Sequence, residues 1–400
     1  MIILSAADLV LPDRILSPGS VVIEGTQIVD VSPGARVAEA RSIHFDLTGR
    51  YIVPGFIDVH VHGVEGHDVL HDEQSVAAIA ATLPRFGTTA FCPTTIACAP
   101  ADLRQALAAV RRAREAPARG SARVLPAHLE SNFINPEYKG AQPLVCLRTP
   151  PLAAAGGRRP QSEEDFSGED ILAEIERFRP DVGILTIAPE LEGGIDLIER
   201  LVAHGHHVSL GHSGADYEVA LAAIRAGARQ ATHLFNRMPP LGHRAPGLAG
   251  AILQSEEVAA ELICDTYHVH AAMMHTAIGA KRPPRIMAIT DGTAGSGLPY
   301  GTRSSIGAWP ITIREVAYLD DGTLAGSVLT MDGAFRNLVG KVGLAPVDAA
   351  ILCATTPARE LGLHGHGVIA PGAIADLAVL DRDFRVLQTY VGGELAYSAP

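Results

Sequence analysis

The stretch Pro54-Gly55-Phe56-Ile57-Asp58-Val59-His60-Val61-His62-Gly63, residues 54–63, is an apolar segment interrupted by polar side chains at alternate positions. Side chains of a β-strand point alternately to its two faces, so Asp58, His60 and His62 are expected on one face. Two neighbouring imidazoles on one face can chelate a single transition-metal ion. The stretch therefore predicts a buried strand that carries metal ligands at its end.

Between Phe56 and Asp291 the sequence alternates between short apolar runs and amphipathic, alanine-rich segments. Strands are expected at 56–61, 88–93, 124–129, 182–187, 206–211, 230–234, 258–264 and 286–290. Helices are expected at 73–85, 101–115, 169–178, 195–204 and 217–226. Eight strands alternating with helices predict an α/β fold, a (β/α)8 TIM barrel, whose active site lies at the carboxyl ends of the strands.

The two ends of the chain differ from this middle part, because both contain short strand-like runs separated by glycine and proline. Neither end has enough strands to bury a sheet alone, so we expect one small β-sandwich domain built from both termini. The predicted domains are 1–52 plus 365–400 for the β-domain and 53–364 for the barrel. Residues 149–165 are expected to form a surface loop, and residues 303–326 a hairpin that covers the site.

Composition narrows the class of partner. The 400 residues are 47% hydrophobic and 19% charged, as in a globular protein, and the net charge is -12. This charge disfavours nucleic acid or an anionic membrane as partner and favours a small molecule. Five cysteines without Cys-x-x-Cys spacing indicate reduced thiols, and no apolar run is long enough for a membrane span. We therefore expect a cytoplasmic location.

Polar residues stand at the ends of five of the predicted strands: His60 and His62, Glu130, His212, His233 and Asp291. Such nitrogen and oxygen ligands, without a thiolate, suit one or two divalent ions per chain, such as Zn²⁺ or Fe²⁺. A bound ion acidifies water and polarises a carbonyl, so hydrolysis of an amide-like bond is the expected chemistry. By contrast, His204, His206 and His207 lie in a helix-to-strand turn and are expected to face solvent.

Longer strings resemble the amidohydrolase superfamily and, more narrowly, the N-acetylglucosamine-6-phosphate deacetylase family. The resemblance covers essentially the whole chain. The most specific strings are Gly-His-Ser-Gly-Ala-Asp-Tyr at 211–217, Thr-His-Leu-Phe-Asn at 232–236 and Leu-Ala-Gly-Ser-Val-Leu-Thr-Met-Asp at 324–332. Further matches are the opening stretch at 54–63, His-Leu-Glu at 128–130, Lys-Gly-Ala at 139–141, Ala-Pro-Glu at 188–190, Thr-Asp at 290–291 and Ala-Asp-Leu-Ala-Val-Leu at 375–380.

The resemblance implies a metal-dependent homodimer that deacetylates N-acetylglucosamine 6-phosphate to glucosamine 6-phosphate and acetate in amino-sugar catabolism. It implies that Glu130, His212 and His233 hold the ion common to the family and that His60 and His62 add a second site. Asp291 would be a metal ligand and the catalytic residue that moves a proton from the attacking water to the departing amine. The implied substrate-binding residues are Ala141, Gln142, Asn236, Arg237, Arg244, His268, Leu324, Ala325 and Gly326, with Asn236, Arg244 and His268 at the phosphate.

Departures from the family pattern cluster around the substrate, at Ser131, Asn132, Gln142, Arg237, Ala245 and Thr266. They leave open which N-acetyl sugar is bound and whether its 6-phosphate is required. Two alternatives therefore remain. One is a related amidohydrolase acting on another N-acetylated amino sugar or N-acyl amide, and the other is a catalytically inactive sugar-binding metalloprotein. The presence of Asp291 favours an enzyme, because binding alone would not require a base.

Overall fold

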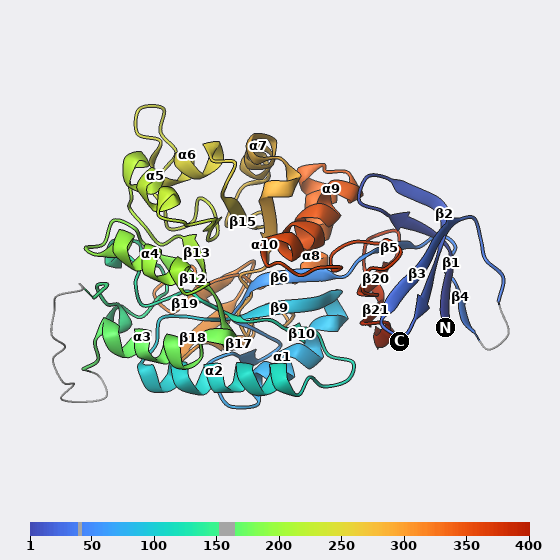
Figure 1. Cartoon of the computed structure of the whole chain (residues 1–400), viewed down its shortest axis with the longest axis horizontal. Helices are drawn as coiled ribbons and strands as arrows, with labels where there is room; N and C mark the ends of the chain where they lie inside the picture. Colours follow the sequence, from blue (N-terminus) through green and yellow to red (C-terminus); the bar gives the residue numbers. More distant parts are fainter. Residues whose placement is uncertain (39–41, 152–164) are drawn as a thin grey trace.

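The centre of the molecule is a parallel β-barrel (Figure 1), seen in a computed structural model that describes residues 1–38, 42–151 and 165–400. Within these residues nine strands pair in the order β10-β9-β11-β12-β13-β14-β15-β16, with β6 beside β9. Their bounds are β6 (Phe56–Val61), β9 (Thr88–Thr95), β10 (Arg123–Val124), β11 (Ala127–Leu129), β12 (Val182–Ile187), β13 (His207–Leu210), β14 (Gln230–Ala231), β15 (Ala259–Ile263) and β16 (Ile286–Ile289). The TIM-barrel prediction is confirmed.

The barrel closes between its first and last strands. Val61 and Gly292 form a parallel bridge, and the backbone N–H of Asp291 donates to the carbonyl of His60 at 3.0 Å. The predicted third strand is split into β10 and β11 on either side of Leu125 and Pro126. Proline has no N–H to donate, so the ladder is interrupted there. The eight strand positions are thus those predicted from the sequence.

Helices surround the barrel (Figure 1), and those expected from the sequence begin and end within a few residues of their predicted limits. The α-helices are α1 (Ser75–Thr82), α2 (Pro100–Glu115), α3 (Gly168–Arg177), α4 (Gly194–Ala203), α5 (Tyr217–Arg225), α6 (Gly247–Gln254), α7 (Ala271–Lys281), α8 (Met331–Asn337), α9 (Pro346–Ala350) and α10 (Thr356–Glu360). Short 3-10 turns lie at Leu83–Phe86, Pro136–Tyr138, Leu144–Cys146, Arg179–Asp181 and Pro283–Arg285, and π-turns at Leu338–Val342 and Ile351–Thr355. The expected helix 73–85 ends early, at Thr82, where Leu83–Phe86 continues as a 3-10 turn containing Pro84. Apolar faces of these helices and of the barrel strands form one continuous core.

Both ends of the chain contribute to a separate sheet, as predicted. It comprises β1 (Ile2–Val10), β2 (Ile15–Glu24), β3 (Gln27–Pro33), β4 (Ile43–Asp46), β5 (Tyr51–Pro54), β20 (Leu377–Leu380), β21 (Val386–Val391) and β22 (Glu394–Ser398). β5 and β20 pair antiparallel and join the two ends. Buried side chains such as Leu4, Ile52, Leu377 and Tyr390 form a core of its own. The β-sandwich built from both termini is confirmed, while the domain limits 1–52 plus 365–400 and 53–364 stay predictions.

Smaller sheets extend from the barrel: β7 (Gly63–Val64) with β8 (His67–Asp68), and β17 (Arg303–Ile306), β18 (Trp309–Ile313) and β19 (Ala317–Leu319). The segment 303–326, expected as a hairpin, is a three-stranded antiparallel sheet. Most of the loop expected at 149–165 lies outside the described residues. Among the described residues no helix is long and apolar enough to cross a membrane.

One solvent-facing prediction is wrong. His206 is only 6% exposed, and its Nδ1 lies 3.0 Å from the carbonyl oxygen of Val182, to which it donates. Burial lowers the pKa of this imidazole. His204 is exposed and His207 is half-buried. The turn packs against the neighbouring strand β12, a contact that the local sequence does not reveal.

Candidate metal centre and substrate cavity

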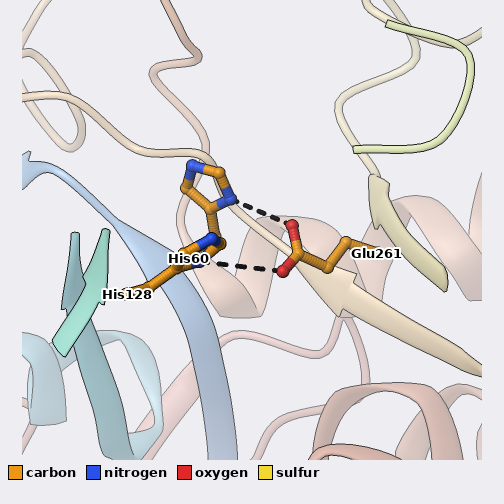
Figure 2. Close-up of side chains that lie close together, drawn as sticks. All are labelled: His60, His128 and Glu261. Carbon is orange, nitrogen blue, oxygen red and sulfur yellow. Dashed lines mark hydrogen bonds and ion pairs between the residues drawn. The ribbon is translucent and has the colours of Figure 1, made fainter. Parts of the chain in front are cut away.

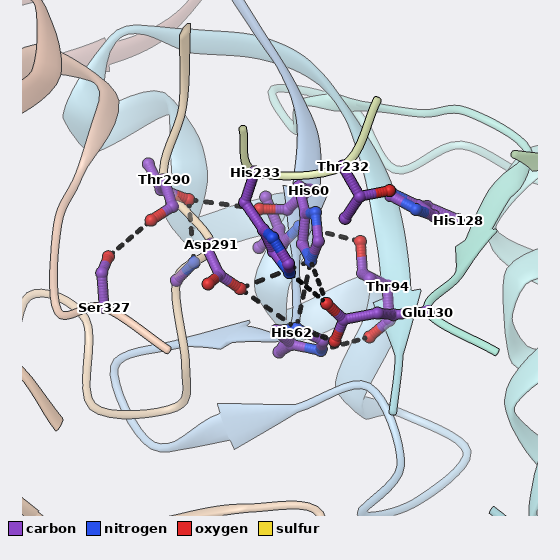
Figure 3. A network of polar contacts seen from close by, with 12 residues as sticks. His60, His62, Thr94, His128, Glu130, Thr232, His233, Thr290, Asp291 and Ser327 are labelled. Atoms are coloured by element: carbon purple, nitrogen blue, oxygen red, sulfur yellow. Dashed lines mark hydrogen bonds and ion pairs between the residues drawn. The ribbon is translucent and has the colours of Figure 1, made fainter. Parts of the chain in front are cut away.

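All six predicted metal ligands meet at the carboxyl ends of the barrel strands. His60 and His62 lie at the end of β6, and Glu130, His212, His233 and Asp291 directly or closely follow β11, β13, β14 and β16. Each of them is at most 7% exposed. Figure 3 shows His60, His62, Glu130, His233 and Asp291 converging on one volume.

The backbone turns sharply where three of these residues leave their strands. His212, His233 and Asp291 have φ of 47°, 30° and 50°, in the left-handed region. Residues other than glycine adopt it rarely, at a cost of about 1–3 kcal/mol, and such positions cluster at functional sites. The strain therefore marks the same rim that the sequence predicts to be functional.

The side chains form two groups that share Glu130. Glu130 Oε1 lies 2.8 Å from His212 Nε2 and 2.8 Å from His233 Nε2, and these two nitrogens are 3.0 Å apart. In the second group, His60 Nε2 lies 3.3 Å from His62 Nε2, and Asp291 Oδ1 is 3.3 Å and 3.2 Å from these nitrogens. The other oxygen of Glu130, Oε2, is 3.5 Å from His62 Nε2, so this carboxylate faces both groups.

This geometry fits divalent metal. Ligands about 2.0–2.1 Å from one tetrahedral ion lie about 3.3 Å from one another, close to the spacings observed here. The Nδ1 atoms of His62 and His212 donate to the backbone carbonyls of Thr94 and Tyr138, at 3.2 and 2.8 Å, which leaves unprotonated Nε2 atoms facing inward. Electron-rich atoms this close together are stabilised by a bound cation.

The pKa shifts within the cluster also favour a bound cation. Burial raises the pKa of Glu130, but the His212 and His233 imidazoles outweigh it and hold this pKa well below its usual value. Burial lowers the pKa of His60, yet the carboxylates of Asp291 and Glu261 raise it to about 10. Among the described residues, no lysine or arginine forms an ion pair with Glu130, Asp291 or Glu261. The cluster therefore favours added positive charge.

A cavity of about 460 Å³ opens above this cluster. Its lining includes the predicted metal ligands His62, Glu130, His212, His233 and Asp291, and the predicted substrate residues Ala141, Gln142, Asn236, Arg237, His268, Leu324 and Gly326. Two predicted substrate residues are not in this lining. Arg244 is exposed, and Ala325 is buried in an apolar cluster with Ile306. Their assignment to the substrate stays a prediction.

Gln142 is held from both ends of its amide. Its Oε1 accepts from the backbone N–H of Ala97 at 2.7 Å, and its Nε2 donates to Oε2 of Glu130. The side chain, 3% exposed, therefore orients the carboxylate shared by the two groups. This is where the sequence departs from the family pattern.

Two further polar side chains, Arg237 and His268, line the same cavity. Within the described residues no carboxylate forms an ion pair with Arg237, so its guanidinium is available to an anion. His268 donates from Nδ1 to Asp265 Oδ2 at 2.6 Å, which leaves its Nε2 for a ligand. The cavity thus contains both the His/carboxylate cluster and two side chains that could bind an anion.

Sequence reasoning missed Glu261 and His128, which lie directly behind His60. Glu261 is fully buried on β15. A signal was present, since Glu261 is the one charged residue in the apolar run 259–263, and a carboxylate is rarely buried without a partner. His128 stood inside a recognised string but received no assignment.

A (β/α)8 barrel whose strand ends carry buried histidines and carboxylates is the architecture of a metal-dependent hydrolase. Residues 51–396 match the model of the Amidohydrolase family. The chain belongs to this family, in the branch of the N-acetylglucosamine-6-phosphate deacetylases.

Relatives and a solved structure place the chain in this branch. It is 34% identical to N-acetylglucosamine-6-phosphate deacetylase of Vibrio furnissii, over 87% of this chain and 83% of the relative. It is also 34% identical to N-acetylgalactosamine-6-phosphate deacetylase of Escherichia coli O157:H7, over 86% and 87%. A mutant of the Mycobacterium smegmatis N-acetyl-D-glucosamine-6-phosphate deacetylase, solved with N-acetyl-D-glucosamine-6-phosphate, superposes with a TM-score of 0.86 at 30% identity, over 99% of each chain.

Proposed function

We propose that this protein is a metal-dependent deacetylase that converts N-acetylglucosamine 6-phosphate to glucosamine 6-phosphate and acetate. The observation that carries the proposal is the cavity that joins the His/carboxylate cluster to Arg237 and His268. One end suits hydrolysis of an amide and the other suits a phosphate dianion. Relatives named for this reaction support the same assignment.

The ligand assignments follow from the two groups of side chains. Glu130, His212 and His233 would hold the common ion, and His60, His62 and Asp291 a second one, with Glu130 able to serve both. A bound divalent ion supplies a Lewis acid for the acetyl carbonyl and lowers the pKa of water. Zinc or iron as the metal, the homodimer and the cytoplasmic location stay predictions.

Asp291 carries the proton. Burial raises the pKa of this carboxyl, but the His60 and His62 imidazoles outweigh it and lower the pKa, so the carboxylate form is available as a base. It takes a proton from the attacking water while the oxygen–carbon bond forms. It then gives this proton to the amine nitrogen as the carbon–nitrogen bond breaks.

The sugar phosphate would bind to Arg237, His268 and Asn236, which also line the cavity. A hydrogen bond to a charged group contributes about 1.5–3 kcal/mol, so Arg237→Ala should raise KM for a phosphorylated substrate about tenfold or more. Arg225→Ala, at an exposed position on α5, is the matched control and should change nothing.

N-acetylgalactosamine 6-phosphate is the second candidate substrate, because the relative named for it is also 34% identical. Purified protein of known metal content would be offered both 6-phosphates and both unphosphorylated sugars, with release of free amine as readout. Release from N-acetylglucosamine 6-phosphate at the highest kcat/KM supports the proposal. Equal rates with and without phosphate would contradict the phosphate site, and no release from any sugar by metal-loaded protein would contradict the function.

A further inference from the structure

Behind the metal cluster, away from the cavity, lies a buried carboxylate that the proposed reaction does not use. Glu261 is 0% exposed on β15 and is not among the residues lining the cavity. Figure 2 shows its carboxylate facing both His60 and His128, with one oxygen toward each. Its Oε2 accepts from His60 Nδ1 at 3.0 Å and from the backbone N–H of His233 at 3.3 Å.

His60 is the partner that satisfies this charge. Within the described residues Glu261 Oε1 has no hydrogen-bond partner, and Nδ1 of His128 is 3.7 Å away from it. Both nitrogens of His128 are engaged elsewhere, with the carbonyl of Val59 at 3.1 Å and the hydroxyl of Thr186 at 2.9 Å. A buried carboxylate that lacks an arginine or lysine partner is stable only if positive charge reaches it in another way. Here the His60 ring is the group through which positive charge stabilises the Glu261 carboxylate.

The four histidines of the cluster differ in the hydrogen-bond partner of their Nδ1 atom. His62 and His212 donate to backbone carbonyls, and His233 Nδ1 has no partner within the described residues. His60 alone among them donates to a carboxylate. A carboxylate on the far nitrogen fixes the tautomer, aims Nε2 at the metal and makes the imidazole a stronger ligand.

We propose that Glu261 is a positioning residue that orients His60 and thereby determines whether the second ion, on His60 and His62, is retained. The inference rests on the proposed metal-dependent function. It is specific to one of the two groups of side chains, because Glu261 contacts a ligand side chain only in the His60 group, and its contact with His233 is to the backbone.

The experiment measures the binding of metal. Metal-free protein would be titrated with Zn²⁺ against a chromophoric chelator, with the number of bound ions measured by mass spectrometry, for wild type and Glu261→Gln. Removing such a partner typically costs about 10–100-fold in metal affinity. We expect this loss for one ion and less than a threefold change for the other. Glu174→Gln, a buried carboxylate paired with Arg104 on the outer helices, is the matched control and should leave both affinities unchanged.

A double-mutant cycle separates positioning from general destabilisation. In a His60→Asn background, Glu261→Gln should have no further effect on the remaining ion. Loss of both ions to the same extent, or unchanged affinities, would overturn the inference while leaving the deacetylase proposal intact. Wild type that binds no divalent ion would instead overturn the proposed function. If Glu261→Gln does not fold, Glu261→Asp, with its shorter side chain, provides the same comparison. Binding of both ions by this variant with wild-type affinity would count against the inference.

Discussion

Replacing Asp291 with asparagine tests the proton transfer directly, because the backbone contacts that place this residue do not involve its side chain. The backbone N–H of Asp291 donates to the carbonyl of His60 at 3.0 Å, and its carbonyl accepts from Ser327 N–H at 2.8 Å. Asparagine tolerates the left-handed φ of 50° about as well as aspartate. Asp291→Asn therefore changes the chemistry of one side chain while the backbone contacts that place it are kept.

The size of the effect follows from what is lost. A positioned general acid–base contributes about 10²–10⁴ in rate, or about 3–5 kcal/mol of barrier. We expect kcat to fall by that factor, with the melting temperature within a few degrees of wild type. The ion on Glu130, His212 and His233 should stay bound, since none of these residues contacts Asp291 within hydrogen-bond distance.

The assay is steady-state release of amine from N-acetylglucosamine 6-phosphate, with metal content measured on the same sample. Asp332→Asn, which removes a carboxylate paired with Arg336 on α8, is the control and should keep full activity. A fully metal-loaded Asp291→Asn protein with more than about a tenth of the wild-type kcat would refute the proton-transfer role.

Three further changes test the surroundings of the site and the fold. Gln142→Leu removes the amide that donates to Glu130, so the common ion should bind about tenfold more weakly in chelator competition, and equal affinity would show that the contact is unimportant. Gly326→Ala places a Cβ 2.8 Å from Thr293 Cγ2 at a φ of +66°, so unfolding in urea should show a loss of at least about 1 kcal/mol, and an unchanged midpoint would contradict this. Burial lowers the pKa of Lys281 to about 8, below its value in the unfolded chain. Above pH 8 the unfolded state therefore binds more protons than the folded state. The free energy of unfolding of the wild type should thus rise as pH increases from about 8 to 10. Lys281→Met should lack this gain, and parallel pH profiles of the two proteins would rule it out.

The barrel and the meeting of the candidate ligands at its rim were predictable because both depend on local patterns. Apolar runs at regular intervals mark the strands, and in a parallel barrel every strand presents its carboxyl end to the same rim. Residues such as His62 and His233, at the ends of strands far apart in the chain, therefore had to meet. This prediction required no knowledge of a contact between the two residues.

Other features depended on contacts that no local pattern contains. Glu261 reaches His60 across 201 residues of sequence, and Gln142 contacts Glu130 because the loop after β11 folds back over the strand end. Arg237 lines the cavity and Arg244, seven residues later, does not, although both are exposed and stand in similar polar loops. Loops lack the periodicity that places strand residues, so their side chains could be assigned only by resemblance.

The sequence by itself determined the architecture, the family and the candidate metal-ligating side chains, because these follow from periodicity and from residues at strand ends. The tertiary structure alone decided how the ligands divide into two groups around Glu130, which cation faces the cavity and which carboxylate supports His60. The physical reason is that metal ligation and proton transfer depend on distances of about 2–3 Å, and such distances between remote residues are set by packing of the whole barrel.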